Sequence, residues 1–408
     1  MSIVSFLSLN LDYFLMLLFG ITIAIILIIN KKKVEFQKLL FPLLYLIMYK
    51  TTWGLRKMDS IASKLKKHRN WLSYTSITLG FLGMITMTVL FLISVYKYFF
   101  IEKEAVVAPL LPGASIPGLP TLTFIHWIIA IFVLATVHEF SHGIFARMYN
   151  IKVKSSGFAF FGILLPIIPA AFVEPDEKQM EKESKKAQLA VLSAGTFSNF
   201  IFAGIFLLIL SFILAPLAAP LAQEQGVIIM NVTDNGPAFN AGMQPNEKIL
   251  SVKGQEINTV NELFEILNST EPYEKIEIKT ENSTYNVVLG EHPDGLSYGY
   301  LGVNLASQTG LNQEIVDKVG KFPIQAFLWL NILIYWLFLT NLMVGLVNLL
   351  PIGIVDGGRM FYIALLGIFK NESAAKKIFA FVSIVLLLLL LFFLIPALFG
   401  YFISPFTN

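Results

Sequence analysis

The sequence predicts a polytopic α-helical membrane protein with about six transmembrane helices, an inserted small α/β domain and a re-entrant β-hairpin. Of its 408 residues, 56% are hydrophobic and only 14% are charged, whereas soluble domains average about 25% charged residues. Apolar stretches recur that approach the roughly 20 helical residues needed to cross a bilayer. A polar stretch at residues 223–307 interrupts them and is typical of a separate small domain.

The transmembrane helices are expected where the chain carries no charge. These stretches are residues 13–30, 70–96, 121–137, 187–222, 323–355 and 378–408. Basic residues cluster at 31–33, 50–69, 147–154, 178–186 and 359–377. The positive-inside rule places such clusters in the cytoplasm. All five clusters agree with one topology, in which both termini and the polar domain lie outside the cytoplasm.

Residues 155–173 are apolar but unsuited to a straight helix, because they include Gly157, Gly162, Pro166 and Pro169. Non-helical backbone at membrane depth is tolerated only against protein or water. We therefore expect residues 157–173 to form a re-entrant hairpin or short β-ribbon packed near the functional site. A kinked seventh span is the alternative.

The polar stretch alternates apolar and polar residues at 275–279 and 285–289, which predicts half-buried strands. Residues 260–268 have helical spacing between those strands and the preceding turns. The stretch is therefore expected to be a mixed α/β domain set between two spans.

The motif that indicates chemistry is His138-Glu139-Phe140-Ser141-His142, an HExxH pattern. On a helix, positions i and i+4 share a face, so both imidazoles can bind one zinc ion. Glu139 can then act as general base on a water that the metal activates. The sequence has no cysteine, so any metal must take nitrogen and oxygen ligands. The alternative is a stray polar patch at a helix end.

A catalytic zinc needs a third protein ligand. His126 lies twelve residues before His138, about 18 Å along a helix, and is therefore too distant. His68 falls in a basic loop and His292 in the polar domain. Asp356 is the candidate, because it ends a long uncharged run where Pro351 and three glycines, Gly353, Gly357 and Gly358, are expected to break the helix. Its alternative role is that of a helix-end cap.

Two further motifs complete a resemblance to a known family. The pattern Asn348-x-x-Pro351-x-x-x-x-Asp356-Gly357 occurs in a later span, and residues 194–199 read Ala-Gly-Thr-Phe-Ser-Asn. With HExxH, they resemble the site-2 protease family of intramembrane zinc metalloproteases, peptidase family M50. Its three-span core would cover about a third of this chain. The family often has a proline where this chain has Thr196.

The resemblance implies that one Zn²⁺ ion is held by His138, His142 and Asp356, with Glu139 as catalytic base. It also implies that Asn199 holds substrate or polarises the scissile carbonyl, and that Asn348, with Pro351, shapes the Asp356 loop and contacts substrate. The alternative for Asn199 is a polar residue in helix packing.

The polar domain looks like a PDZ domain, because Gly236-Pro237-Ala238 precedes Ala241-Gly242-Met243 and a turn and strand follow. PDZ domains bind chain ends by strand addition. A peptide ligand is therefore one expectation for this domain, and a size filter that keeps bulky ectodomains from the site is another.

The chain is accordingly divided into five regions. They are 1–120, an N-terminal membrane region with two spans and a basic cytoplasmic loop; 121–222, the HExxH span, hairpin and second core span; 223–307, the extracytoplasmic PDZ-like domain; 308–369, the third core span with the Asp-Gly motif; and 370–408, a C-terminal span.

The expected function is regulated intramembrane proteolysis, the hydrolysis of peptide bonds within or near transmembrane segments of single-span membrane-protein substrates. The expected partners are those substrates and the lipid bilayer, with no nucleic acid, and the expected location is the cell membrane. Two other functions fit less well. A non-catalytic scaffold need not keep all four site residues, and a transporter would be expected to show paired broken helices.

Overall fold

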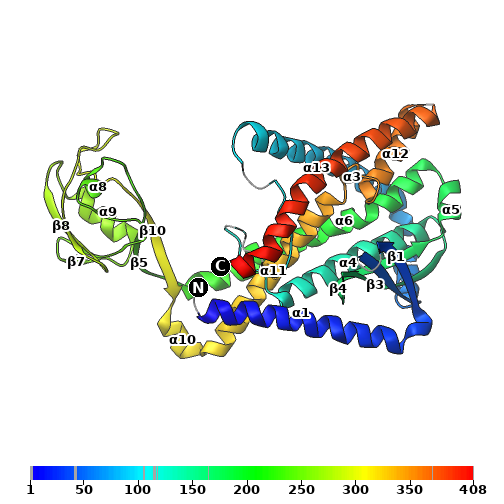
Figure 1. Cartoon of the computed structure of the whole chain (residues 1–408), viewed down its shortest axis with the longest axis horizontal. Coiled ribbons are helices and arrows are strands. Elements are labelled where there is room, and N and C mark those ends of the chain that lie inside the picture. Colours follow the sequence, from blue (N-terminus) through cyan, green and yellow to red (C-terminus); the bar gives the residue numbers. More distant parts are fainter. Residues whose placement is uncertain are drawn as a thin grey trace. The chain divides into compact units, whose positions relative to one another are not determined.

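The computed structural model describes residues 3–40, 44–103, 106–113, 116, 118–163, 165–369 and 371–407. The chain divides into two compact units. The first joins Met1–Leu210 to Leu330–Asn408, and the second is Ser211–Trp329. Figure 1 shows the elements of both units.

The helices of the first unit follow the apolar pattern. They are α1 (Ile3–Ile29), α2 (Leu55–Leu65), α3 (Arg69–Phe100), α4 (Phe124–Met148), α5 (Glu177–Lys182), α6 (Lys185–Ile209), α11 (Lys321–Val347), which begins in the second unit, α12 (Asp356–Ile368) and α13 (Glu372–Thr407). Short 3₁₀ turns at Lys31–Lys33 and Lys66–His68 precede β1 and α3.

Five helical segments of the described chain are long and apolar enough to cross a membrane. They correspond to five of the six expected spans: Leu55–Phe100, Phe124–Met148, Lys185–Leu221, Lys321–Val347 and Glu372–Tyr401. The sixth, in α1, has a shorter apolar part at Phe14–Ile29. The chain is therefore an integral membrane protein, and a total of six spans stays a prediction.

The apolar stretch after α4 is a β-hairpin and not a kinked helix. Strands β3 (Val153–Ile163) and β4 (Leu165–Pro175) pair antiparallel. Two strands that we did not expect, β1 (Val34–Leu40) and β2 (Leu44–Thr51), extend them to a four-stranded sheet of order β1-β2-β3-β4. The sheet packs on α4 through β3 and β4 (Figure 1). Its entry into the membrane stays a prediction.

Helix α6 lies at the centre of the first unit and packs against α3, α4 and α12. Ten consecutive residues, 190–199, are all buried, so this part of the helix is enclosed by protein on every side. Small side chains such as Ala190, Ser193 and Ala194 allow the neighbouring helices to approach closely, as is usual between membrane helices.

A tight loop joins α11 to α12 and sets the position of Asp356. The N–H of Gly357 donates to the carbonyl of Asn348, and the N–H of Gly353 donates to Ser383 Oγ on α13. We expected all the glycines here to break the helix. Instead Gly357 and Gly358 lie in the first turn of α12, where a Cβ would collide with the backbone of the folded-back loop. They permit close packing and do not end a helix.

The second unit contains the expected mixed α/β domain. Its strands are β5 (Ala222–Val232), β6 (Lys248–Val252), β7 (Gln255–Glu256), β8 (Lys275–Thr280), β9 (Thr284–Val288) and β10 (Val303–Leu311), and its short helices are α7 (Ala215–Ala218), α8 (Pro237–Asn240), α9 (Val260–Asn268) and α10 (Gln313–Val319). A π-helical turn, Leu210–Leu214, precedes α7, and a 3₁₀ turn, Ala219–Leu221, follows it. The sheet order is β10-β5-β6-β8-β9, with β7 beside β6.

Helix α9 shows how local sequence sets this domain. The hydroxyl of Thr259 accepts the N–H of Glu262, while the Glu262 carboxylate accepts the N–H groups of Asn258 and Thr259, forming a capping box. These two backbone donors hold the pKa of Glu262 below its usual value. Leu263 and Leu267 on the opposite face enter the core of the domain. The strands and helix expected at residues 260–289 are confirmed.

Candidate active site

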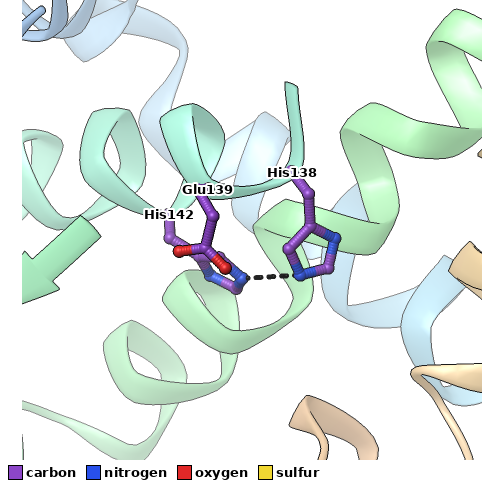
Figure 2. Close-up of side chains that lie close together, drawn as sticks. All are labelled: His138, Glu139 and His142. Carbon is purple, nitrogen blue, oxygen red and sulfur yellow. Dashed lines mark hydrogen bonds between the residues drawn. The ribbon is translucent and has the colours of Figure 1, made fainter. Parts of the chain in front are cut away.

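The two histidines of the HExxH motif project from the same face of α4, one helical turn apart. Their Nε2 atoms face each other at 3.1 Å (Figure 2). Both side chains are buried, with His138 8% and His142 9% exposed. The two imidazole nitrogens point at one spot inside an apolar core. A metal ion can bind between nitrogens placed in this way.

Asp356 reaches the same spot from α12. Its Oδ2 lies 3.1 Å from His138 Nε2 and 3.2 Å from His142 Nε2. Asp356 stands in the first turn of α12, where the helix dipole favours a negative charge. The helix is capped by Val355 without a side-chain hydrogen bond, so Asp356 does not serve as the cap.

Both imidazoles are oriented by a second hydrogen bond on Nδ1. His142 Nδ1 lies 2.7 Å from the carbonyl oxygen of Val191, which accepts its proton. His138 Nδ1 lies 3.0 Å from the amide nitrogen of Asn199. The amide oxygen of Asn199 is buried without a partner among the described residues. Because amide N and O are assigned and not observed, exchanging them would let that oxygen accept the His138 Nδ1 proton. Such bonds turn Nε2 toward a metal.

Gly195 on α6 leaves open the space beside the three ligand atoms. A Cβ at this position would lie 2.5 Å from Nε2 of both His138 and His142. The ligand atoms are 3.1–3.2 Å apart, close to the roughly 3.3–3.4 Å expected around a tetrahedral zinc with bonds of about 2.0–2.1 Å. Two nitrogens, one carboxylate oxygen and this clearance fit a zinc ion.

Glu139 lies beside the histidines and is tied to the hairpin. One of its carboxylate oxygens and the two histidine nitrogens lie within 4.8 Å of one another, and Figure 2 shows the Glu139 carboxylate next to the His142 ring. Glu139 Oε2 accepts the N–H of Val173 in β4 at 3.1 Å. This hydrogen bond holds Oε2 in place, whereas Oε1 takes no part in it and can accept a proton.

The other predicted site residues have different surroundings. Asn348 holds the loop through its backbone carbonyl, and Asn199 contacts His138. Sequence reasoning gave no role to Val173, Val191 or Gly195. Two of these act through backbone atoms and leave no side-chain signal. Gly195 belongs to the 194–199 motif, and it matters because it has no side chain to fill the site.

Comparison with known proteins identifies the family of this chain. A model described as peptidase family M50 matches residues 126–390. An uncharacterized protein of Methanocaldococcus jannaschii is 28% identical over 342 residues, 80% of this chain and 80% of that protein. A protein of Fusobacterium nucleatum with the provisional name zinc metalloprotease is 26% identical over 302 residues, 62% of this chain and 87% of its own length.

Two further comparisons cover less. RasP of Bacillus subtilis, named regulator of sigma-W protease, is 22% identical over 53% of this chain and 60% of its own length. Among solved structures, the PDZ domain of an SdrC-like protein from Listeria monocytogenes is 16% identical, covers 23% of this chain and 94% of its own, and has a TM-score of 0.18.

Replacing Gly195 by alanine is expected to abolish metal binding, because the new methyl group would occupy the space beside both Nε2 atoms. Zinc in the purified protein, measured by atomic emission, should fall from about one ion per chain to near zero. Gly204→Ala is the matched control, since it lies on the same helix with nothing within 4 Å of its Cβ position. Full zinc retention in Gly195→Ala would contradict the site.

Replacing Asn199 by alanine removes the partner of His138 Nδ1. Zinc affinity is expected to fall by about 10–100-fold, as for other residues that orient a metal ligand, measured by competition with a chelator. Ser198→Ala is the control, because Ser198 bonds only to the carbonyls of Val137 and Gly195. Unchanged affinity with slower proteolysis would instead favour the substrate role that the sequence suggested.

Proposed function

The chain belongs to peptidase family M50, and on that premise we propose that it hydrolyses peptide bonds within or near the transmembrane segments of single-span membrane proteins. It is a zinc metalloprotease of the membrane. The observation that carries the proposal is that Asp356 of α12 reaches His138 and His142 beside Glu139. The HExxH residues lie on α4, a helix apolar enough to span a bilayer. A hydrolytic site on a membrane-spanning helix is suited to substrates that also lie in the membrane.

The chain's own residues supply the base and the orientation. When bound, one zinc ion would lower the pKa of a water molecule to about 7 and polarise the scissile carbonyl. Glu139 Oε1 takes the proton of that water, while the Val173 N–H holds Oε2 in place. The same carboxyl then passes the proton to the leaving amine. Val191 and Asn199 keep the two imidazoles facing the ion.

A scaffold role and a transport role are less well supported. A protein that only presented its polar domain would not need buried His138, His142 and Asp356 in mutual contact, since such groups are costly in a membrane interior. A transporter relay would need further titratable groups leading away from the site. The site packs instead against Gly195, Val191 and Val173, which offer none.

We propose that the substrate is held as an added strand on β4. In the described sheet β4 pairs only with β3, so its other side is an edge. The Val173 N–H points away from β3, because it bonds to Glu139. Alternation along the strand gives the same direction to the backbone of Ala171. A transmembrane helix must unwind before water can attack it, and an edge next to the catalytic base would hold the unwound segment.

The location and the polar domain complete the proposal. We infer a location in the cell membrane. The basic clusters favour a PDZ-like domain outside the cytoplasm, which labelling of a single introduced cysteine by an impermeant reagent would test. In that domain β10 is an edge strand in contact with α9. A peptide end could add to this edge, and calorimetric titration with C-terminal peptides is the measurement. A size filter is the other role.

Glu139→Gln is expected to retain zinc and lose proteolysis. Glutamine keeps the size of the side chain and can still accept the Val173 N–H, but it cannot take a proton, so the rate should fall by about 10²–10⁴-fold. The assay follows a purified single-span protein in detergent or vesicles by gel and mass spectrometry. Chelator should stop cleavage by the parent, and readdition of zinc should restore it. Cleavage at parental rate by Glu139→Gln would refute the mechanism.

The chain lacks cysteine, so strand addition can be tested by disulfide trapping. A cysteine at Ala171 in β4 should cross-link to single cysteines placed along an unwound substrate segment, since side chains on adjacent strands lie about 4.5–5.5 Å apart. The background is Glu139→Gln, so that the substrate survives. A cysteine at Glu35, in the strand at the opposite edge of the sheet, is the control. Equal trapping at both edges would exclude the model.

A further inference from the structure

A small hollow lies beside the Glu139 carboxylate. Thr136, Glu139 and Phe140 line it from α4, since positions i, i+3 and i+4 share one helix face. Phe158 of β3 and Ala171 of β4 line it from the hairpin. The hollow thus adjoins both the general base and the strand at which a substrate is proposed to lie.

A third wall comes from a part of the chain outside the matched family region. Trp53 and Met58 line the same hollow, whereas the M50 match begins at residue 126. The segment is secured to β3 by side-chain hydrogen bonds. Ser156 Oγ donates to the carbonyl of Trp53 at 2.6 Å, and Thr51 Oγ1 donates to the carbonyl of Ser156 at 3.0 Å. The wall is therefore built into the hairpin.

The turn after Trp53 is shaped to fit the HExxH helix. Gly54 has a φ of +85°, and a Cβ there would lie 3.2 Å from the ring of Phe140. Met58, in the first turns of α2, is only 1% exposed. Its sulfur would lie 2.5 Å from a Cβ at Gly143, one turn beyond Glu139 on α4. These two glycines let the N-terminal segment press against the catalytic helix.

The hollow suits a small side chain. The centre of a water-sized molecule can move through only about 30 Å³ of it, two to three times what one water needs. The lining is mainly apolar and aromatic, from Trp53, Met58, Phe140 and Phe158. Thr136 also lines it, and its hydroxyl is buried without a hydrogen-bond partner among the described residues.

We propose that this hollow receives one substrate side chain flanking the cut bond, and that Trp53 and Met58 restrict it to residues of alanine to valine size, serine and threonine included. The inference rests on the proposed endopeptidase function and adds its side-chain specificity. The Thr136 hydroxyl pairs with the hydroxyl of a bound serine or threonine. A phenylalanine ring is excluded by the volume of the pocket.

The test uses the full-length protein and a set of single-span substrates varied at two positions on each side of the mapped cut. At one of these positions, the parent should cleave substrates with alanine, serine, threonine or valine at least about tenfold faster than the substrate with phenylalanine. One methylene in a tight pocket changes kcat/KM by about 10–200-fold. Trp53→Ala should reduce that ratio about fivefold or more. Trp71→Ala is the matched control, because Trp71 is 66% exposed and Trp53 72%.

Two reciprocal variants make the outcome specific. Ala171→Val narrows the pocket from the hairpin side and should lower the rate for valine relative to alanine by about tenfold. Thr136→Val should remove the preference for substrates with threonine over those with valine. The ratio of the cleavage rates for alanine and valine substrates should stay the same. Zinc content and thermal melting confirm that each variant is folded.

The possible results separate two failures. If the parent shows zinc-dependent cleavage but Trp53→Ala and Trp71→Ala have the same side-chain profile as the parent, the pocket is wrong and the protease function stands. If the parent cleaves no membrane substrate and chelator has no effect, the proposed function is overturned, and the pocket with it.

Discussion

The structure depends on bringing two imidazoles and a carboxylate within 3.1–3.2 Å of one another inside an apolar core. Each of these groups is costly to bury alone, and together they fit the ligand set proposed for one cation. The helices around the site are arranged to make that approach feasible. Gly195 removes the side chain of α6 that would otherwise fill the centre, and the glycines after Asp356 let its loop fold closely against α12.

The same constraint explains why the supporting contacts are made by backbone atoms. The carbonyl of Val191 fixes His142, and the N–H of Val173 fixes Glu139. Backbone groups on packed elements cannot rotate away as long side chains can, so the site is preorganised by the positions of α6 and β4 themselves. The Glu139 carboxylate is therefore held at the edge strand β4, and this contact is the basis for proposing that a substrate strand binds there.

The N-terminal segment adds to this core without supplying a metal ligand. Its strands β1 and β2 enlarge the hairpin to a four-stranded sheet, and its turn at Trp53 and Gly54 meets the HExxH helix. The candidate site residues and a wall from the N-terminal segment thus meet in one hollow.

Hydropathy and motif spacing predicted the class of the molecule and the residues of its candidate site. Hydropathy located five of the helices, since a bilayer-length apolar run has few alternatives. Period-two and helical spacing located β8, β9 and α9. HExxH and Asp356 were identifiable because only nitrogen and oxygen ligands exist in a chain without cysteine. Tertiary structure alone decided the rest. Strand pairing of residues 34–51 with β3, the clearance at Gly195 and the backbone bonds of Val173 and Val191 all depend on contacts between residues far apart in the chain, which leave no periodic or side-chain pattern in the sequence.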